Sequence, residues 1–181
     1  MVSKQEIEEA IKGKDDFVKI NYLNRFLKKA DSLDMKKFIH LNLAAINESK
    51  GLFYDAVKNV SSAGDISVTF REKRELYMKE VELWIKAGEF IFAEKAFNKA
   101  MGYGSENERV QMQIQYEDLF RAIGKSYEDQ GKVRKAIEVY KRLFENTKNT
   151  SRKNEIKEKL SELYEKTGRI LESDRVKNLK I

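Results

Sequence analysis

Two cationic side chains, Arg121 and Lys125, form the pair in this sequence best placed to bind an anion. They are four residues apart, so on an α-helix both lie on one face. Together they could hold a carboxylate or an acidic peptide segment. Catalytic residues are scarcer, because the chain has no cysteine and one histidine, His40. This composition excludes thiol nucleophiles, thiolate metal sites and paired imidazoles. We expect His40 to be a partly buried packing residue.

Two other patterns resemble sites but have simpler interpretations. The segment Gly102–Ser105 has the glycines of a phosphate loop, yet it lacks the third glycine and no Lys-Ser/Thr pair follows. It is more typical of a linker between helices, with Ser105 as the N-cap. Adjacent carboxylates such as Asp15 and Asp16 face different directions on a helix and do not converge on one substrate. We therefore expect no enzymatic activity, no cofactor and no metal site.

The elements that position these residues are helices. The 181 residues include no proline, and 41% are hydrophobic and 36% charged. Apolar residues recur at three- and four-residue spacing, which predicts amphipathic helices, and no run alternates as a strand would. The segment Ser61–Asp65 is predicted to be a turn. The expected helices span 2–12, 15–31, 34–49, 52–63, 66–87, 89–102, 106–130, 132–147, 151–167 and 169–180.

Five glycines divide these helices at similar intervals: Gly13, Gly51, Gly88, Gly131 and Gly168. A glycine can adopt the left-handed conformation that closes a short turn between two helices. An alanine follows five residues after three of them, as Ala56, Ala93 and Ala136. A larger apolar residue follows nine residues after the same three glycines, as Val60, Phe97 and Tyr140. A period near 40 with one helix hairpin per unit predicts an all-α solenoid.

With this spacing the chain resembles the tetratricopeptide repeat (TPR) superfamily, including its SNAP-like members. Residues 117–150 match best, through Phe120, Ile123, Gly124, Tyr127, Gly131, Ala136, Tyr140 and Leu143. Lys148 stands where the family's closing proline is found. The resemblance implies a right-handed superhelix of four to five antiparallel hairpins. It implies one domain over residues 1–181, with approximate units 1–36, 37–70, 74–107, 117–150 and 154–181.

The resemblance also implies a partner-binding groove lined by the first helix of each unit. Carried over to this chain, the groove residues are Leu41, Ala45, Glu48, Met78, Glu82, Ile85, Asp118, Arg121, Lys125, Glu128, Glu158 and Glu162. The family's clamp for chaperone tails needs Lys and Asn in adjacent units, where this chain has other residues, so we do not expect that activity. Leu41, Met78 and Ile85 indicate an apolar half-groove suited to an amphipathic helix.

We therefore expect a non-catalytic scaffold or adaptor that binds a protein or peptide. One alternative is a nucleic-acid-binding solenoid, suggested by a pI near 9.2 and by Arg152, Lys153, Lys157 and Lys159. Aromatic residues interleaved with lysine could stack on bases, but helical spacing assigns most of them to the core: Phe17, Tyr22, Phe26, Phe53, Tyr54, Phe90 and Phe92. Another alternative is self-association. No segment is apolar enough to insert in a membrane, and we expect a cytoplasmic protein because no secretory signal pattern opens the chain.

Overall fold

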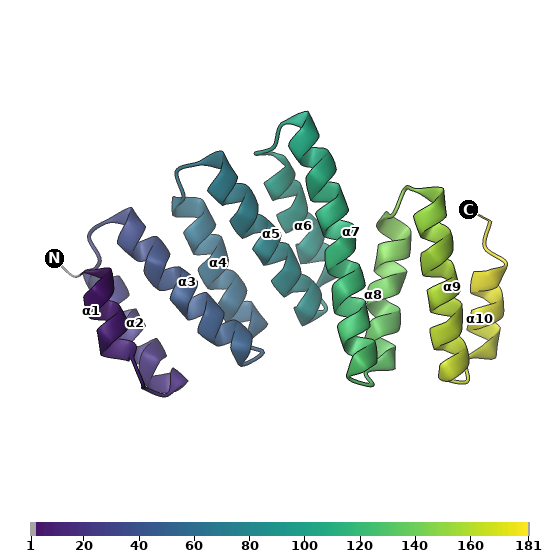
Figure 1. Ribbon diagram of the computed structural model, residues 1–181, viewed down its shortest axis with the longest axis horizontal. Helices are drawn as coiled ribbons and strands as arrows, with labels where there is room; N and C mark the ends of the chain where they lie inside the picture. Colours follow the sequence, from purple (N-terminus) through teal and green to yellow (C-terminus); the bar gives the residue numbers. More distant parts are fainter. Residues whose placement is uncertain (1–2, 181) are drawn as a thin grey trace. The chain divides into compact units, whose positions relative to one another are not determined.

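The computed structural model describes residues 3–180, which form ten α-helices and, within that range, no strand (Figure 1). The all-α fold class predicted from the sequence is confirmed, and each helix lies within a few residues of its expected range. None of the helices in residues 3–180 has both the length and the apolar character needed to cross a bilayer. The helices are α1 Lys4–Ile11, α2 Asp16–Lys29, α3 Leu33–Ser49, α4 Phe53–Ile66, α5 Phe70–Ala87, α6 Phe90–Met101, α7 Glu106–Asp129, α8 Val133–Asn146, α9 Thr150–Lys166 and α10 Ile170–Lys177.

The five predicted turn glycines close five helix hairpins, from α1–α2 to α9–α10. All five have positive φ, between 69° and 82°, a conformation that side chains with a Cβ adopt at a cost. The turn after α3 shows the hydrogen bonding: Gly51 N–H donates to the carbonyl of Glu48 and Leu52 N–H to that of Asn47, both at 2.9 Å. These bonds satisfy carbonyls that the end of a helix leaves unpaired.

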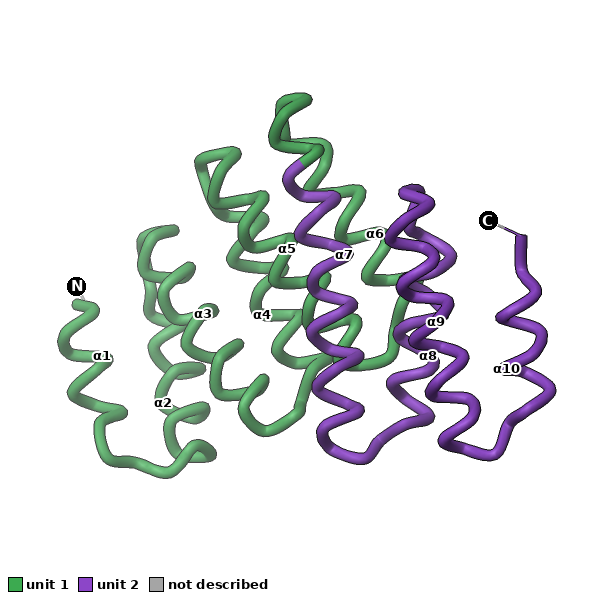
Figure 2. Tube along the Cα trace, turned by 45° about the vertical axis from the view of Figure 1, so that its right-hand side comes forward, with its two compact units in different colours: residues 1–110 green, residues 111–181 purple. Residues whose placement is uncertain are grey.

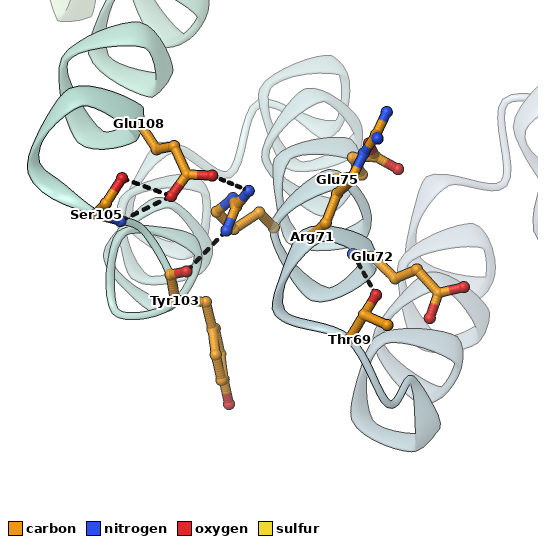
Figure 3. Close-up of polar contacts among 8 residues, drawn as sticks. Thr69, Arg71, Glu72, Glu75, Tyr103, Ser105 and Glu108 are labelled. Atoms are coloured by element: carbon orange, nitrogen blue, oxygen red, sulfur yellow. Dashed lines mark hydrogen bonds and ion pairs between the residues drawn. The ribbon is translucent and has the colours of Figure 1, made fainter.

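Side chains at the helix starts satisfy the first free N–H groups. Ser3 and Glu6 form a capping box at the start of α1. Thr69 caps α5, and its hydroxyl accepts from the N–H of Glu72 at 3.2 Å (Figure 3). Before α7, the carboxylate of Glu108 accepts from the N–H and the hydroxyl of Ser105 at 2.8 and 2.7 Å (Figure 3). The segment Gly102–Ser105 is thus a helix linker, as the sequence predicts.

The predicted turn at Ser61–Asp65 is wrong, because α4 continues through this segment to Ile66. Gly64 is buried there, and a Cβ built on it would lie 2.7 Å from Cε1 of Tyr77 on α5. This glycine lets an aromatic ring pack directly on the helix backbone. The real break is the short segment Ser67–Thr69, where Ser67 donates to the carbonyl of Ala63.

The chain forms two compact units, residues 1–110 and 111–181 (Figure 2). The first contains α1 to α6 with the start of α7, and the second contains the rest of α7 with α8 to α10. Within each unit, consecutive helices run antiparallel and pack as sequence neighbours (Figure 1). The single domain over the whole chain stays a prediction.

Small residues sit where helices approach most closely. Ala56, Ala93 and Ala136, the alanines that follow the turn glycines, are all 0% exposed. In the last hairpin the equivalent residue, Ser173, is also 0% exposed, and its hydroxyl lies 2.8 Å from that of Ser161. The hydrogen bond between the two hydroxyls satisfies the buried Ser173, at a position where three other hairpins have the methyl group of an alanine.

Several polar contacts between successive hairpins join residues 34 or 35 apart in sequence. Lys37 pairs with Glu72 at 2.7 Å, Lys99 with Asp65 at 2.8 Å, and Arg121 with Glu155 at 3.2 Å. Arg74 bonds both Glu108 and the carbonyl of Tyr103, and so ties the linker before α7 to α5. This recurring offset shows that similar contacts repeat between hairpins. The chain thus fits a TPR-type helical repeat.

Candidate partner-binding site

In the first unit, only part of the expected apolar groove lies at the surface. Leu41 and Ala45 on α3 are exposed, Leu41 to 37%. Met78 and Ile85 on α5 are 9% and 0% exposed, so their side chains offer almost no surface to a partner. A surface helix needs only one apolar face, but α5 has apolar residues on more than one face. Met78 and Ile85 therefore pack against neighbouring helices. The binding role of the four residues stays a prediction.

Glu82, the remaining predicted residue of α5, belongs to a ring of four alternating charges. Lys79 lies 2.9 Å from both Glu48 and Glu82, and Lys86 lies 2.7 Å from Glu48 and also pairs with Glu82. Burial raises the pKa of Glu48, but hydrogen bonds from Lys86 and Lys79 outweigh it and leave that pKa below its usual range. The ring joins α3 to α5. The i, i+3, i+7 spacing of Lys79, Glu82 and Lys86 places them on one helix face, so the sequence could have indicated this ring of charges.

In the second unit, the anion-binding pair is only partly available. Arg121 and Lys125 share one helix face, but Arg121 pairs with Glu155 on α9. Lys125 is exposed and makes no ion pair with any residue in 3–180. Glu128 accepts from the hydroxyl of Tyr140 at 2.9 Å and pairs with Lys159 at 2.8 Å. An acidic partner would therefore compete with Glu155 for Arg121. Asp118 is exposed, as are Glu158 and Glu162 on α9.

The basic residues behind the nucleic-acid alternative are engaged within the second unit. Arg152 lies 2.7 Å from Glu117, which is 4% exposed, and Lys159 pairs with Glu128. Lys157 donates to the carbonyl of Leu179 at 2.8 Å, and Lys153 lies over the ring of Phe144. The two ion pairs offset positive charge that phosphates would need, whereas Lys157 and Lys153 keep their charge.

A different site lies in the first unit, in a pocket of about 390 Å³ between α4 and α5. This volume is near the lower end of the range for ligand pockets. Residues of α4 form one wall and two residues of α5 form the other. The pocket is lined by Tyr54, Val57, Lys58, Ser61, Ser62, Asp65, Glu80 and Trp84.

Three aromatic rings form a cluster at one end of this pocket. Tyr54 and Trp84 meet edge-to-face with centroids 5.4 Å apart, and Trp84 stacks on Phe92 at 5.0 Å. The hydroxyl of Tyr54 donates to Glu89, which begins the turn into α6. The cluster thus joins α4, α5 and α6, yet Tyr54 and Phe92 remain 58% and 44% exposed. The cluster is rigidly held and open to solvent.

Glu80 supplies the unusual polar group of the pocket. Its Oε1 accepts from the indole N–H of Trp84 at 3.2 Å, whereas its Oε2 is buried with no hydrogen-bond partner. Burial raises the pKa of this carboxyl, and the bond from Trp84, the charge of Lys99 and a hydrogen bond from Ser61 offset the rise only in part. A buried carboxylate oxygen without a donor is rare in folded proteins, because it has lost its water without replacement.

At the other end of the pocket the charges are satisfied. Asp65 accepts from the Tyr77 hydroxyl at 3.0 Å and from Lys99 at 2.8 Å. Burial raises the pKa of Asp65, but these two bonds bring it below its usual value. Burial and the bond to Asp65 raise the pKa of Tyr77 to about 12. Glu80 is thus the less well satisfied of the two carboxyls in this pocket.

Sequence reasoning did not find this site. The assignment of most aromatic residues to the core is wrong for Phe17, Tyr54 and Phe92, which are exposed, and the other four in that group are half-buried. One sequence pattern could have indicated part of this site: Glu80 precedes Trp84 by four residues on one helix, and this spacing predicts contact between the two side chains.

His40 is half-buried on α3, as predicted, and its Nδ1 lies 2.9 Å from Oδ1 of Asn59. The amide nitrogen of Asn59 donates to the carbonyl of Asp55, so Oδ1 is the acceptor and Nδ1 of His40 carries the proton. Across residues 3–180, no group of three or more histidine, aspartate or glutamate side chains is placed to hold a metal ion.

Comparison with known proteins identifies no family for this chain. No protein-family model matches it, and no curated protein matches it. A solved structure described as the crystal structure of MamA is similar at 18% sequence identity, over 97% of this chain and 91% of that one, with a TM-score of 0.45. The fold assignment therefore rests on the helices, turns and packing of the chain itself.

Proposed function

We propose that this chain is a non-catalytic protein-interaction scaffold whose first unit binds a protein partner at the pocket between α4 and α5. The observation that carries the proposal is the open cluster of Tyr54, Trp84 and Phe92 beside that pocket. Tryptophan and tyrosine are enriched among the residues that contribute most to binding at protein interfaces. Rings already held in place lose little conformational entropy when a partner covers them.

The predicted groove residues support binding less well than this pocket does. Glu82, Arg121 and Glu128 already have partners within their own unit, and an incoming charge would have to replace them. Met78 and Ile85 are buried. The groove residues that remain exposed are Leu41, Ala45, Asp118, Lys125, Glu158 and Glu162. A partner that used the groove would depend on Lys125 and not on the aromatic cluster, and the two sites can be separated by substitution.

The test is affinity capture from a native lysate with the tagged full chain, with and without nuclease. The variants are Tyr54→Ala with Phe92→Ala, Arg121→Glu with Lys125→Glu, and Phe17→Ala as the matched control. Phe17 is also an aromatic residue of the first unit, is 72% exposed, and lies outside the pocket. We expect a specific protein that survives nuclease, is retained by the control and falls at least about tenfold with the aromatic variant.

Other outcomes would contradict the proposal. Capture that the aromatic variant leaves unchanged but Arg121→Glu with Lys125→Glu abolishes would move the site to the groove. Prey that disappears with nuclease would favour the nucleic-acid alternative. A mass in light scattering that rises with concentration in the wild type, but not in the aromatic variant, would show that the cluster serves self-association instead.

A further inference from the structure

We propose that one edge of the first unit binds the surface of an anionic lipid bilayer and places Val68 and Phe70 at the level of the lipid headgroups. This connector edge consists of residues 28–37, 65–75 and 99–109, which contain the loops between successive hairpins and the helix turns beside them. Figure 1 draws these three loops at the upper ends of the hairpins, opposite the turn glycines. The contact is peripheral and separate from the pocket between α4 and α5, which neither Val68 nor Phe70 lines.

The first argument is that apolar side chains project into solvent from this edge. Val68, in the loop between α4 and α5, is 81% exposed, and Phe70, the first residue of α5, is 66% exposed. Leu33, the first residue of α3, is 55% exposed. A single exposed apolar residue is ordinary in a folded protein. Here three of them lie at or just before the starts of two helices, where a loop in water is normally polar.

Contacts between the loops hold these side chains along one edge. Lys37 and Glu72 pair at 2.7 Å and join the start of α3 to the start of α5. The ring of Phe70 lies 5.7 Å from that of Tyr103 in the loop before α7, and Arg74 donates to the carbonyl of Tyr103 at 3.0 Å (Figure 3). The loops are therefore held relative to one another before binding, which lowers the entropic cost of binding.

The second argument is the charge of the connector edge. Five of its acidic residues are already paired with a lysine or arginine, namely Asp34, Asp65, Glu72, Glu75 and Glu108. Two others form no ion pair with a residue in 3–180, Asp31 and Glu106. By the same criterion five cations of the edge are free of acidic partners: Lys28, Lys29, Lys36, Lys73 and Arg109. The charges that remain are therefore mainly positive and complement anionic headgroups.

The combination of apolar and cationic side chains favours a lipid surface over other occupants. A nucleic acid would use the cations, but the aliphatic Val68 and Leu33 have no ring to stack on a base. A protein partner would need a hollow shaped to receive the projecting Val68 and Phe70. The fluid boundary between headgroups and acyl chains accepts such side chains without a preformed hollow, and lysines beside them add electrostatic attraction.

The first experiment locates the contact. The chain has no cysteine, so Val68→Cys gives a single site for a polarity-sensitive fluorophore. The matched control is Ile91→Cys, because Ile91 is 64% exposed and lies near the turn glycine Gly88, at the opposite end of the hairpins. The probes are vesicles of phosphatidylcholine alone and vesicles with about one third phosphatidylserine. We expect a blue shift at residue 68 with the anionic vesicles alone, and no shift at residue 91 with either.

The second experiment measures affinity by co-sedimentation with the same vesicles. Val68→Ser with Phe70→Ser removes the apolar contact and should weaken binding to anionic vesicles at least about tenfold. Phe17→Ser with Ile91→Ser, which replaces two equally exposed apolar residues outside the edge, should leave it unchanged.

The cations are tested in the same assay. Lys28→Gln with Lys29→Gln should weaken binding about tenfold or more, since each cation near an anionic membrane contributes about fivefold. Lys58→Gln with Lys125→Gln removes two exposed cations from elsewhere and should have little effect.

Several outcomes would overturn the assignment. One is a wild type that fails to bind anionic vesicles at about 0.1 M salt, where charges within about 10 Å still interact. Another is a Val68→Ser, Phe70→Ser variant that is folded by circular dichroism and binds as the wild type does, because charge alone would then account for binding. A blue shift at residue 91 equal to that at residue 68 would place the contact elsewhere. Binding of a single-stranded oligonucleotide that needs Lys28 and Lys29, without vesicle binding, would assign the edge to nucleic acid.

Discussion

The contact between Gly64 and Tyr77 yields a sharp stability prediction for the first unit. Gly64 lies inside α4, and a methyl group placed on it would lie 2.7 Å from Cε1 and 3.2 Å from Cζ of Tyr77. Tyr77 is 1% exposed, and its hydroxyl is bonded to Asp65 at 3.0 Å. The ring therefore cannot move aside without disturbing the core or breaking that bond.

The effect of Gly64→Ala is the balance of opposing contributions. Alanine in a helix interior is favoured over glycine by about 1 kcal/mol. Overpacking a well-packed site costs about 1–3 kcal/mol. Losing the hydrogen bond from Tyr77 to an ionised carboxylate would remove a further 1.5–3 kcal/mol or so. We expect a net loss of about 1.5–5 kcal/mol in the free energy of unfolding, although a simple propensity scale predicts a gain.

The assay is urea unfolding followed by the fluorescence of Trp84, which lies in the first unit and reports on it alone. For a slope of about 2 kcal/mol/M, a loss of 2 kcal/mol lowers the midpoint by about 1 M. Gly102→Ala is the matched control, because Gly102 has helical angles of φ −61° and ψ −22° and its nearest neighbour is 3.4 Å away. That variant should be neutral or gain up to about 1 kcal/mol.

The reasoning is refuted if Gly64→Ala unfolds at the same midpoint as the wild type or at a higher one, with an unchanged slope. A second check combines Gly64→Ala with Tyr77→Leu, which removes the ring atoms in the way. The double variant should lose less stability than the sum of the two single losses.

Four further predictions follow from the structure. Ala93→Leu should lower the free energy of unfolding by about 1–3 kcal/mol in urea, because Ala93 is 0% exposed; an unchanged midpoint would show that the hairpin register is wrong. Gly88→Ala should lose about 1–2 kcal/mol by the same assay, because φ is 82° and no neighbour crowds the site, so a larger loss would implicate packing. Arg152→Ala should lower the melting temperature, since it leaves the buried Glu117 with the hydrogen bond from Gln113 but no cation, whereas the exposed control Lys166→Ala should have almost no effect. The pKa of Glu80 is raised in the folded state, so the wild type loses stability as the pH rises through that pKa and the carboxyl ionises. Glu80→Gln cannot ionise. Its free energy of unfolding in urea, minus that of the wild type, should therefore increase from pH 4 to pH 7.

Local features predicted most of the fold. The turn glycines and the alanine five residues after three of them act over a single helical turn or one tight turn. The error at Ser61–Asp65 arose where local propensity and packing disagree. Serine, glycine and aspartate favour a turn, but Tyr77 packs on Gly64 and keeps the segment helical.

The candidate site was much less predictable than the fold. Helical spacing correctly places Arg121 and Lys125 on one face, but it contains no information on Glu155, which lies 34 residues after Arg121 and pairs with it. Tyr54 and Phe92 have the spacing of core residues, yet both are exposed. Residue type and helical spacing do not distinguish an exposed aromatic residue from a buried one, or a free cation from a paired one.

The sequence by itself determined the helices and most of their ends, because hydrogen bonds and side-chain contacts within three or four residues control them; the end of α4 is the exception. Tertiary structure alone decided which charges are neutralised and which groups are buried. Those outcomes depend on helices that meet across about 34 residues of chain, as Lys99 does with Asp65. The packing of α4 and α6 around α5 exposes the aromatic cluster and leaves one carboxylate oxygen of Glu80 without a donor.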